Sequence, residues 1–167
     1  MITLAIDGST RASGLAVFDD KKLIYYTCLY ESGSDTTGRI LRMANRIKDV
    51  CLEYKVKQII MEDVLPEDVK HNDNTYTPLK YLQAAVVFVM YNLRIPIEFK
   101  IATWWRARCG IKTGPGRKRE VLKQDAIKFV KNKYNVDVTN DIADAVCLGC
   151  AYLGIGNEPA AAPFNWE

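Results

Sequence analysis

The 167-residue sequence contains a single histidine, His71, and five cysteines scattered over apolar positions. An odd number of cysteines fits a reducing compartment better than a disulfide framework. Cys147 and Cys150 form a C-x-x-C pair, but no second pair or histidine follows at the spacing of zinc ligands. We therefore expect free thiols and no zinc centre, and we place His71 in an exposed loop.

Long apolar runs are missing as well. The longest, AAVVFVMY from Ala84, is far shorter than a membrane-spanning helix, and no basic segment precedes the apolar N-terminal residues. The composition, 49% hydrophobic and 26% charged, is that of an ordinary globular protein with room for one α/β domain. We expect a soluble, cytoplasmic protein without membrane contact, with one domain over residues 1–154 and a C-terminal tail over 155–167.

The net charge of +3 is modest, but it is unevenly distributed. Between Trp104 and Lys133 there are ten Lys or Arg residues and two acids, which gives 10 − 2 = +8 for this segment. The remainder therefore sums to 3 − 8 = −5. A basic segment of this size is typical of a surface that neutralises nucleic-acid phosphates, although a solvated helix face is the alternative.

The pattern of apolar residues predicts a mixed α/β fold. Short β-rich runs predict three antiparallel strands over residues 1–7, 14–20 and 21–30, followed by an amphipathic helix over 35–54. The continuation predicts a strand over 56–63, a polar loop over 65–78, a helix over 79–93 and a strand over 95–100. The last third is predicted to be helical but interrupted by a glycine-rich hinge over 110–119, after which helices follow over about 120–134 and 140–154. This order predicts a five-stranded mixed sheet with helices on both faces.

Four acidic residues have reason to converge in such a fold. Asp7 ends the first strand and Glu62 ends the fourth, which would lie beside it. Asp141 and Asp144 lie three residues apart in the last helix, so their side chains leave the same face. Asp63 should point to the opposite face of its strand, and we assign it a structural role.

Clustered carboxylates repel one another and persist where a cation neutralises them. Oxygen ligands without histidine or thiolate support favour Mg²⁺, with Mn²⁺ as a substitute. Two such ions about 4 Å apart can activate water and stabilise the leaving oxygen of a phosphodiester, which is nuclease chemistry. For any single acid the alternative is structural, since strand ends and helix N-termini favour acids anyway.

Three motifs resemble those of the RuvC family of Holliday-junction resolvases, which have the ribonuclease H-like fold. They are AIDGSTRASGLAVFD with Asp7 and Gly14, IIMEDV with Glu62, and NDIADAVCLG with Asp141 and Asp144. The resemblance covers about residues 1–154. It implies a Mg²⁺-dependent endonuclease with two ions per active site, in which these four carboxylates are the catalytic and metal-binding residues.

The same resemblance implies a homodimer, similar to viral members among others, that binds a four-way DNA junction and makes paired nicks. In this family the second helix contributes to the dimer contact, whereas burial within the monomer is an equal alternative for the apolar YLQAAVVFVMYNL. The family has basic residues near the scissile phosphate, which Lys123 and Arg106 match best. The full set of predicted DNA-binding residues is Arg106, Lys112, Arg117, Lys118, Arg119 and Lys123.

The sequence departs from the family just after Glu62. Members commonly place an aromatic residue there to stack on the opened junction, whereas this chain has Leu65 and Pro66, and Tyr76 is the nearest aromatic in the predicted loop. Trp104 and Trp105 could stack on bases, although aromatics beside a strand end more often belong to the core. Cleavage of forks or three-way junctions would be a natural broadening of the activity.

Three other functions stay open at this stage. One is an RNA-directed nuclease of the same fold. A second is a non-catalytic module that binds branched DNA, against which the four intact carboxylates argue. The third is an ATPase-like phosphate-binding domain, because sugar kinases also begin with a strand, an Asp and a Gly-Ser/Thr turn; such enzymes need two such domains, and Asp141 and Asp144 would have no role there.

Overall fold

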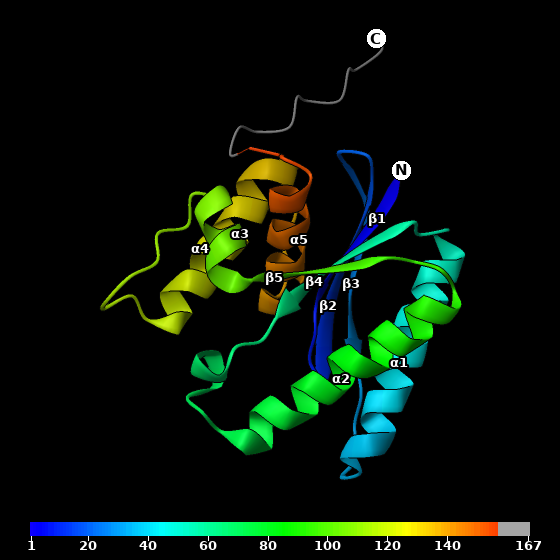
Figure 1. Cartoon of the computed structure of the whole chain (residues 1–167). Coiled ribbons are helices and arrows are strands. Elements are labelled where there is room, and N and C mark those ends of the chain that lie inside the picture. The colour runs from blue at the N-terminus through cyan, green and yellow to red at the C-terminus, as the bar shows by residue number, and fades with distance from the viewer. Residues whose placement is uncertain (157–167) are drawn as a thin grey trace.

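A five-stranded mixed sheet forms the centre of the structure, a computed structural model that describes residues 1–156 (Figure 1). The strand order is β3-β2-β1-β4-β5. The strands are β1 (Ile2–Asp7), β2 (Ala12–Asp19), β3 (Lys22–Tyr30), β4 (Gln58–Asp63) and β5 (Ile97–Ile101). The first three strands pair in antiparallel fashion, while β4 runs parallel to both β1 and β5. The predicted sheet is therefore confirmed. Most of the predicted C-terminal tail, from residue 157 on, lies outside the described residues.

Helices cover both faces of this sheet, as expected (Figure 1). The two longer ones, on one face, are α1 (Thr36–Glu53) and α2 (Asp73–Asn92). Those on the other face are α3 (Ala102–Arg108), α4 (Arg119–Tyr134) and α5 (Asn140–Tyr152). The alternation along β1 sends Leu4 and Ile6 into the core under α1 and α2, and Ala5 into the core under α5. Because β1 is buried on both faces, its last residue is firmly placed.

The close packing of α5 on the sheet depends on small residues. Ala143, Ala145 and Gly149 are fully or almost fully buried on this helix, and a Cβ atom at Gly149 would clash with the ring of Phe18 on β2. Small side chains let the helix axis approach the strands, and the N-terminal turn of α5 is thereby brought against the ends of β1 and β2.

The prediction for the segment before α2 is wrong in part. A short 3₁₀-helix, η1 (Pro66–Val69), lies within the predicted loop, and α2 begins at Asp73 rather than at Leu79. Asn72 caps the helix, since its side chain accepts a hydrogen bond of 3.0 Å from the backbone N–H of Asn74. Pro78 lies inside α2 and removes one backbone donor, which the capped first turns tolerate.

All five cysteines are unbonded to one another, as expected. Cys147 and Cys150 are buried on α5, where the Cys150 thiol lies 3.2 Å from the Tyr134 hydroxyl. His71 is exposed between η1 and α2, which confirms its predicted position. Across residues 1–156, no helix combines the length and the apolarity that crossing a membrane requires.

Candidate active site

The four predicted carboxylates come from three elements that meet at one edge of the sheet. Asp7 is the last residue of β1, and Glu62 lies near the end of the parallel neighbour β4. Asp141 and Asp144 lie in the first turns of α5, which packs across β1 and β2. The structure brings Asp7, Glu62 and Asp141 to one groove, and Asp144 is near enough to raise the pKa of Asp7.

A glycine on β2 makes this arrangement possible. Gly14 pairs with Asp7 across the β1–β2 ladder. A Cβ atom at this position would clash with the backbone carbonyl of Asp141. The glycine of the first motif therefore lets the first turn of α5 lie directly against the strand that carries Asp7.

A groove of about 490 Å³ opens over the site. Asp7, Glu62 and Asp141 line it and are half-buried, whereas Asp144 is buried and is not among the lining residues. The remaining walls come from the β1–β2 turn, the start of α1, the segment from β4 to the start of α2, and Arg119. The groove is open to solvent along this length and can admit an extended ligand.

Burial is the main cause of the electrostatic state of the site. It raises the pKa of Asp7 well above its usual value, and the carboxylates of Glu62, Asp144 and Asp141 raise it further. Burial likewise raises the pKa of Glu62 to about 7 and that of Asp144 to about 6, despite the lowering effect of Arg106 on both. The site thus concentrates negative charge that the surrounding protein does not fully offset.

The donor set fits a hard divalent cation in its chemistry. Among residues 1–156, none of the four carboxylates forms an ion pair with a Lys, Arg or His side chain within 4.0 Å. Buried carboxylates without such partners are stabilised by a bound cation, and oxygen-only donors suit Mg²⁺ or Mn²⁺. In the described part of the chain, however, no three Asp, Glu, His or Cys side chains are grouped closely enough to hold a metal ion as they stand. Binding therefore requires the carboxylates to move closer together.

The two acids at the end of β4 point to opposite faces of the sheet, as expected. The indole N–H of Trp105 on α3 donates a 2.6 Å hydrogen bond to Glu62 Oε2. Asp63 instead accepts a 2.6 Å hydrogen bond from the ammonium group of Lys80 on α2. This ion pair gives Asp63 the predicted structural role, and it ties the start of α2 to the sheet beside the groove.

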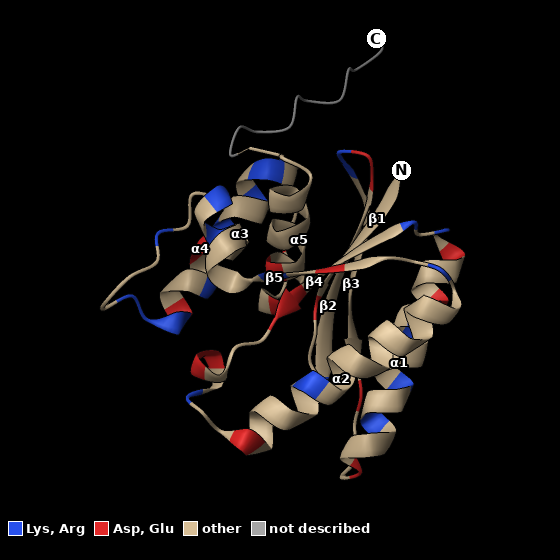
Figure 2. Ribbon diagram, viewed as in Figure 1, with Lys and Arg blue, Asp and Glu red and all other residues tan. Residues whose placement is uncertain are grey.

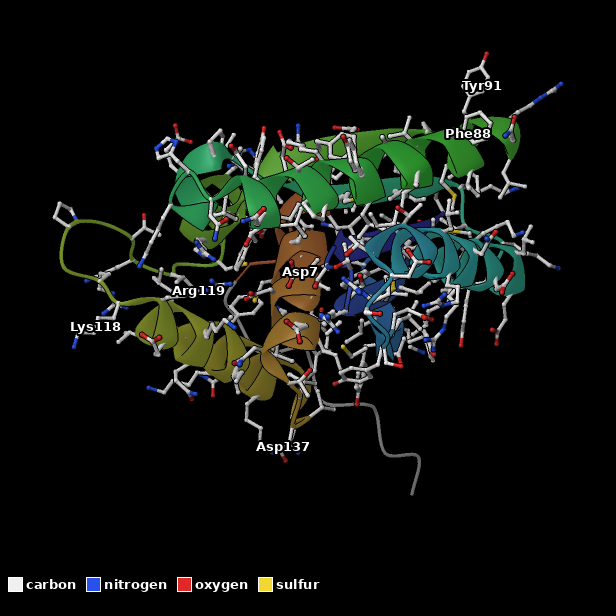
Figure 3. The ribbon with its side chains drawn as sticks, turned by 90° about the horizontal axis from the view of Figure 1, so that it is seen from below. Asp7, Phe88, Tyr91, Lys118, Arg119 and Asp137 are labelled. Carbon is white, nitrogen blue, oxygen red and sulfur yellow. The ribbon has the colours of Figure 1, made fainter. Side chains whose placement is uncertain are left out.

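The predicted DNA-binding residues fall into two groups within the region of α3, α4 and their connection, where Figure 2 shows several Lys and Arg positions in blue. Arg106, Arg119 and Lys123 lie near the carboxylates, because each lowers the pKa of Asp144. The others, Lys112, Arg117 and Lys118, are exposed on the segment between α3 and α4. Figure 3 shows Lys118 at the outer side of this segment, with Arg119 between it and Asp7.

Three of the side chains considered for DNA contact are engaged within the protein. The Arg117 guanidinium pairs with Asp125 and donates a 3.2 Å hydrogen bond to the backbone carbonyl of Lys112. The fully buried Trp105 cannot stack on a base. Trp104 is half-buried, with the Arg108 guanidinium 4.0 Å from its ring centroid.

Sequence reasoning missed the opposite wall of the groove. Arg11, Thr36 and Arg39 line it there, and the buried Arg39 donates hydrogen bonds to the Gly33 carbonyl (2.5 Å) and to Thr36 Oγ1 (3.0 Å). Arg39 lies on the apolar face of α1, four residues before Met43, and this spacing is the sequence signal that could have distinguished it from an exposed arginine. The Trp105–Glu62 hydrogen bond was also missed, since it joins residues 43 positions apart.

Comparisons with known proteins support the fold. No protein-family model matches the sequence, and no curated protein sequence matches it. In solved structures, the chain is similar to Thermus thermophilus RuvC in complex with a Holliday junction substrate, with a TM-score of 0.70 and 13% identity over 93% of this chain and 98% of that chain. It is also similar to the fowlpox virus resolvase in complex with Holliday junction DNA, with a TM-score of 0.60 and 17% identity over 92% of this chain and 97% of that chain.

A third neighbour is the yeast mitochondrial Holliday junction resolvase Ydc2, with a TM-score of 0.59 and 10% identity over 90% of this chain and 77% of that chain. The structural neighbours of this chain are thus RuvC and RuvC-like Holliday junction resolvases. The chain has the ribonuclease H-like fold of these resolvases, as predicted. At such low identities the likeness concerns the fold, and the activity has to be argued from the site.

Proposed function

We propose that the protein is a Mg²⁺-dependent, structure-selective endonuclease that resolves four-way DNA junctions by paired nicks. The observation that carries this proposal is that Asp7, Glu62 and Asp141 line one groove with the buried Asp144 near them, and that none of the four has an ion-pair partner in the described chain. The fold, shared with resolvases that were solved with junction DNA, supports the choice of substrate.

The four carboxylates would hold two Mg²⁺ ions, which when bound supply a nucleophilic water and stabilise the leaving oxygen. Asp7 and Glu62 lie at the ends of adjacent parallel strands, so the sheet fixes the separation of their backbones and leaves their side chains to close on the ions. Asp141 and Asp144 approach from α5. The resulting pocket is built from rigid elements, as the geometry of an in-line displacement requires.

The basic residues beside the carboxylates would place the scissile phosphate. Arg119 lines the groove, and Arg106 and Lys123 act on Asp144 from α3 and α4. Their positive charges offset the repulsion between the DNA phosphate and the acidic site. The exposed Lys112 and Lys118 extend this positive surface along the neighbouring strand of the substrate.

We also propose that the protein is a homodimer that uses α2. One side of α2 packs on the sheet through Leu82, Val86 and Met90. The other side exposes large apolar residues, with Phe88 70% and Tyr91 80% exposed, and Figure 3 shows both projecting outward from the helix. An aromatic row of this kind on a soluble protein marks an interaction surface, and a second copy with a second active site would account for paired nicks.

The dimer proposal is tested by sedimentation of Phe88→Glu. A charge at Phe88, within the exposed aromatic surface of α2, should convert the protein to a monomer that still binds Mn²⁺. Leu52→Glu is the matched control, since Leu52 is an exposed apolar residue on a different helix, α1. A monomeric wild type, or dissociation by both substitutions alike, would contradict the use of α2.

The proposed activity is tested by a panel of end-labelled substrates in Mg²⁺: four-way, three-way and forked DNA, linear duplex, and an RNA–DNA hybrid. We expect cutting of branched DNA and little cutting of linear duplex. Preference for the hybrid would indicate an RNA-directed nuclease of the same fold. Junction binding without cutting would indicate a non-catalytic module.

A further inference from the structure

The carboxylate of Glu62 is held by the protein in a way that the other three are not. Among residues 1–156, Glu62 is the only one of the four whose side chain accepts a hydrogen bond from another protein group. The donor is the indole N–H of Trp105, 2.6 Å from Oε2. An N–H donor at this distance makes a strong, charge-assisted hydrogen bond to a carboxylate.

Trp105 is itself immobile. The side chain is completely buried, in the cluster that contains Ala5, Ile60 and Ala143 between the sheet and α5. The Arg106 guanidinium lies 4.9 Å from the centroid of its ring. A side chain packed in this way has one rotamer, so the position of its N–H is set by the core rather than by Glu62.

The main chain of Glu62 is fixed as well. Gln83 on α2 donates a 3.0 Å hydrogen bond to the backbone carbonyl of Glu62, and β4 is paired with β5 at this position. With backbone and Oε2 both held, the remaining freedom of the side chain is small. Oε1 is then the oxygen left for another partner.

We infer that Trp105 is a positioning residue that orients the Glu62 carboxylate, holding Oε2 and leaving Oε1 to bind the divalent cation. This inference rests on the proposed nuclease function. It assigns Glu62 a single-oxygen mode of binding, and it makes the residue the fixed point of the site, toward which the freer Asp7 and Asp141 side chains move. Partners that orient a metal ligand in this way commonly change metal affinity by about 10- to 100-fold.

The test measures Mn²⁺ binding to the DNA-free protein by titration calorimetry. Trp105→Phe keeps most of the buried ring and removes the N–H, and we expect the dissociation constant for Mn²⁺ to rise by about 10-fold or more. Trp104→Phe is the matched control, because Trp104 is the neighbouring tryptophan on the same helix and, among residues 1–156, its indole N–H donates no hydrogen bond to Glu62. It should bind Mn²⁺ as the wild type does.

A double-mutant cycle separates positioning from general loosening of the core. In the Glu62→Gln background, Trp105→Phe should cause no further loss of Mn²⁺ affinity, because the indole acts through the Glu62 carboxylate. If Trp105→Phe fails to fold, replacement of Trp105 by 3-benzothienylalanine removes the N–H at nearly constant shape. The same 10-fold weakening is expected with this replacement.

Unchanged Mn²⁺ affinity in Trp105→Phe or in the benzothienyl variant would overturn the inference, and so would an equal loss in the Glu62→Gln background. These results would leave the proposed function standing if the wild type binds Mn²⁺ and cuts junctions. Failure of the wild type to bind Mn²⁺ and to cut any branched DNA would instead overturn the proposed function, and the role of Trp105 with it.

Discussion

The carboxylate site and the part of the basic segment that connects α3 to α4 are built in opposite ways. Asp7 and Glu62 sit at the ends of central strands, and Asp144 is buried on a helix packed against them. Lys112 and Lys118, in contrast, are exposed on a connection without regular structure, in which Gly114 (φ 149°) adopts a conformation that other residues avoid. Catalytic side chains need fixed positions. Side chains that contact a phosphate backbone need positive charge and can remain mobile.

Arg119 joins the two regions. It begins α4, and it lines the groove that contains Asp7, Glu62 and Asp141. Its neighbour Lys118 faces away from that site (Figure 3). Under the proposed function, substrate DNA bound by Lys112 and Lys118 would pass Arg119 before it reaches the carboxylates.

The largest expected effect comes from removing charge in the rigid region. Asp7→Asn, Glu62→Gln, Asp141→Asn or Asp144→Asn should each lower the single-turnover rate of junction cleavage in Mg²⁺ by about 100- to 1,000-fold or more, because each removes a ligand oxygen charge. Junction affinity, measured by gel shift without divalent metal, should stay near or above that of the wild type. If these substitutions weakened junction binding as much as cleavage, the carboxylates would not act in cleavage alone, and the proposed difference between the two regions would be wrong.

Charge reversal in the exposed region should weaken binding instead. Lys112→Glu together with Lys118→Glu removes two phosphate contacts, so the slope of log affinity against log salt should become shallower by about 0.9 per contact. The cleavage rate of fully bound junction should change little. Lys131→Glu is the control, since Lys131 lies on α4 and pairs with Asp137 at 2.8 Å. A slope unchanged from the wild type would show that the basic segment does not contact the DNA.

The smallest effect concerns the pH dependence of stability without metal. Burial raises the pKa of Asp144 from 3.8 to about 6, so the folded protein binds more protons than the unfolded chain between about pH 4 and 6. The free energy of unfolding should therefore fall as the pH rises through this window. Asp144→Asn should remove this loss and stabilise the protein by about 1 to 2 kcal/mol at pH 7.5.

Urea denaturation in EDTA at pH 4.5 and 7.5 checks this prediction. The free energies of unfolding of the variant and the wild type should differ more at pH 7.5, where Asp144 is ionised, than at pH 4.5, where it is mostly protonated. The contributions of the other titrating groups cancel when the two proteins are compared. Lys118→Glu, in the exposed region, is the control. Its free energy of unfolding should differ from that of the wild type by the same amount at both pH values. If the free energy of unfolding of Asp144→Asn changed with pH as that of the wild type does, the ionised Asp144 carboxylate would not destabilise the folded protein, and the prediction would be wrong.

Much of the fold could be predicted from the sequence because its patterns are local. Strand ends at Asp7 and Glu62 and the three-residue spacing of Asp141 and Asp144 each follow from a few consecutive residues. The start of α2 could not be predicted in the same way. The cap at Asn72 outweighs Pro78, and the balance between capping and a lost backbone donor depends on the surroundings of that turn.

The parts of the site that were missed depend on contacts between distant elements. Trp105 reaches Glu62 only because α3 folds back over the end of β4, and Arg39 lines the groove only because α1 begins beside the β1–β2 turn. No spacing in the sequence encodes either contact. Conversely, Arg117 was predicted to contact DNA from its charge and its place in the glycine-rich hinge, and its ion pair with Asp125 depends on the path of the connection before α4.

The central claim is that four converging carboxylates make this protein a junction-resolving nuclease. The direct measurement is cleavage of a synthetic four-way junction, with each strand end-labelled in turn, by the wild type, Asp141→Asn and Asp144→Asn in Mg²⁺. We predict paired nicks in two strands of like polarity by the wild type and none by the variants. Intact junctions with the wild type in both Mg²⁺ and Mn²⁺, or cutting by both variants at the wild-type rate, would contradict the account.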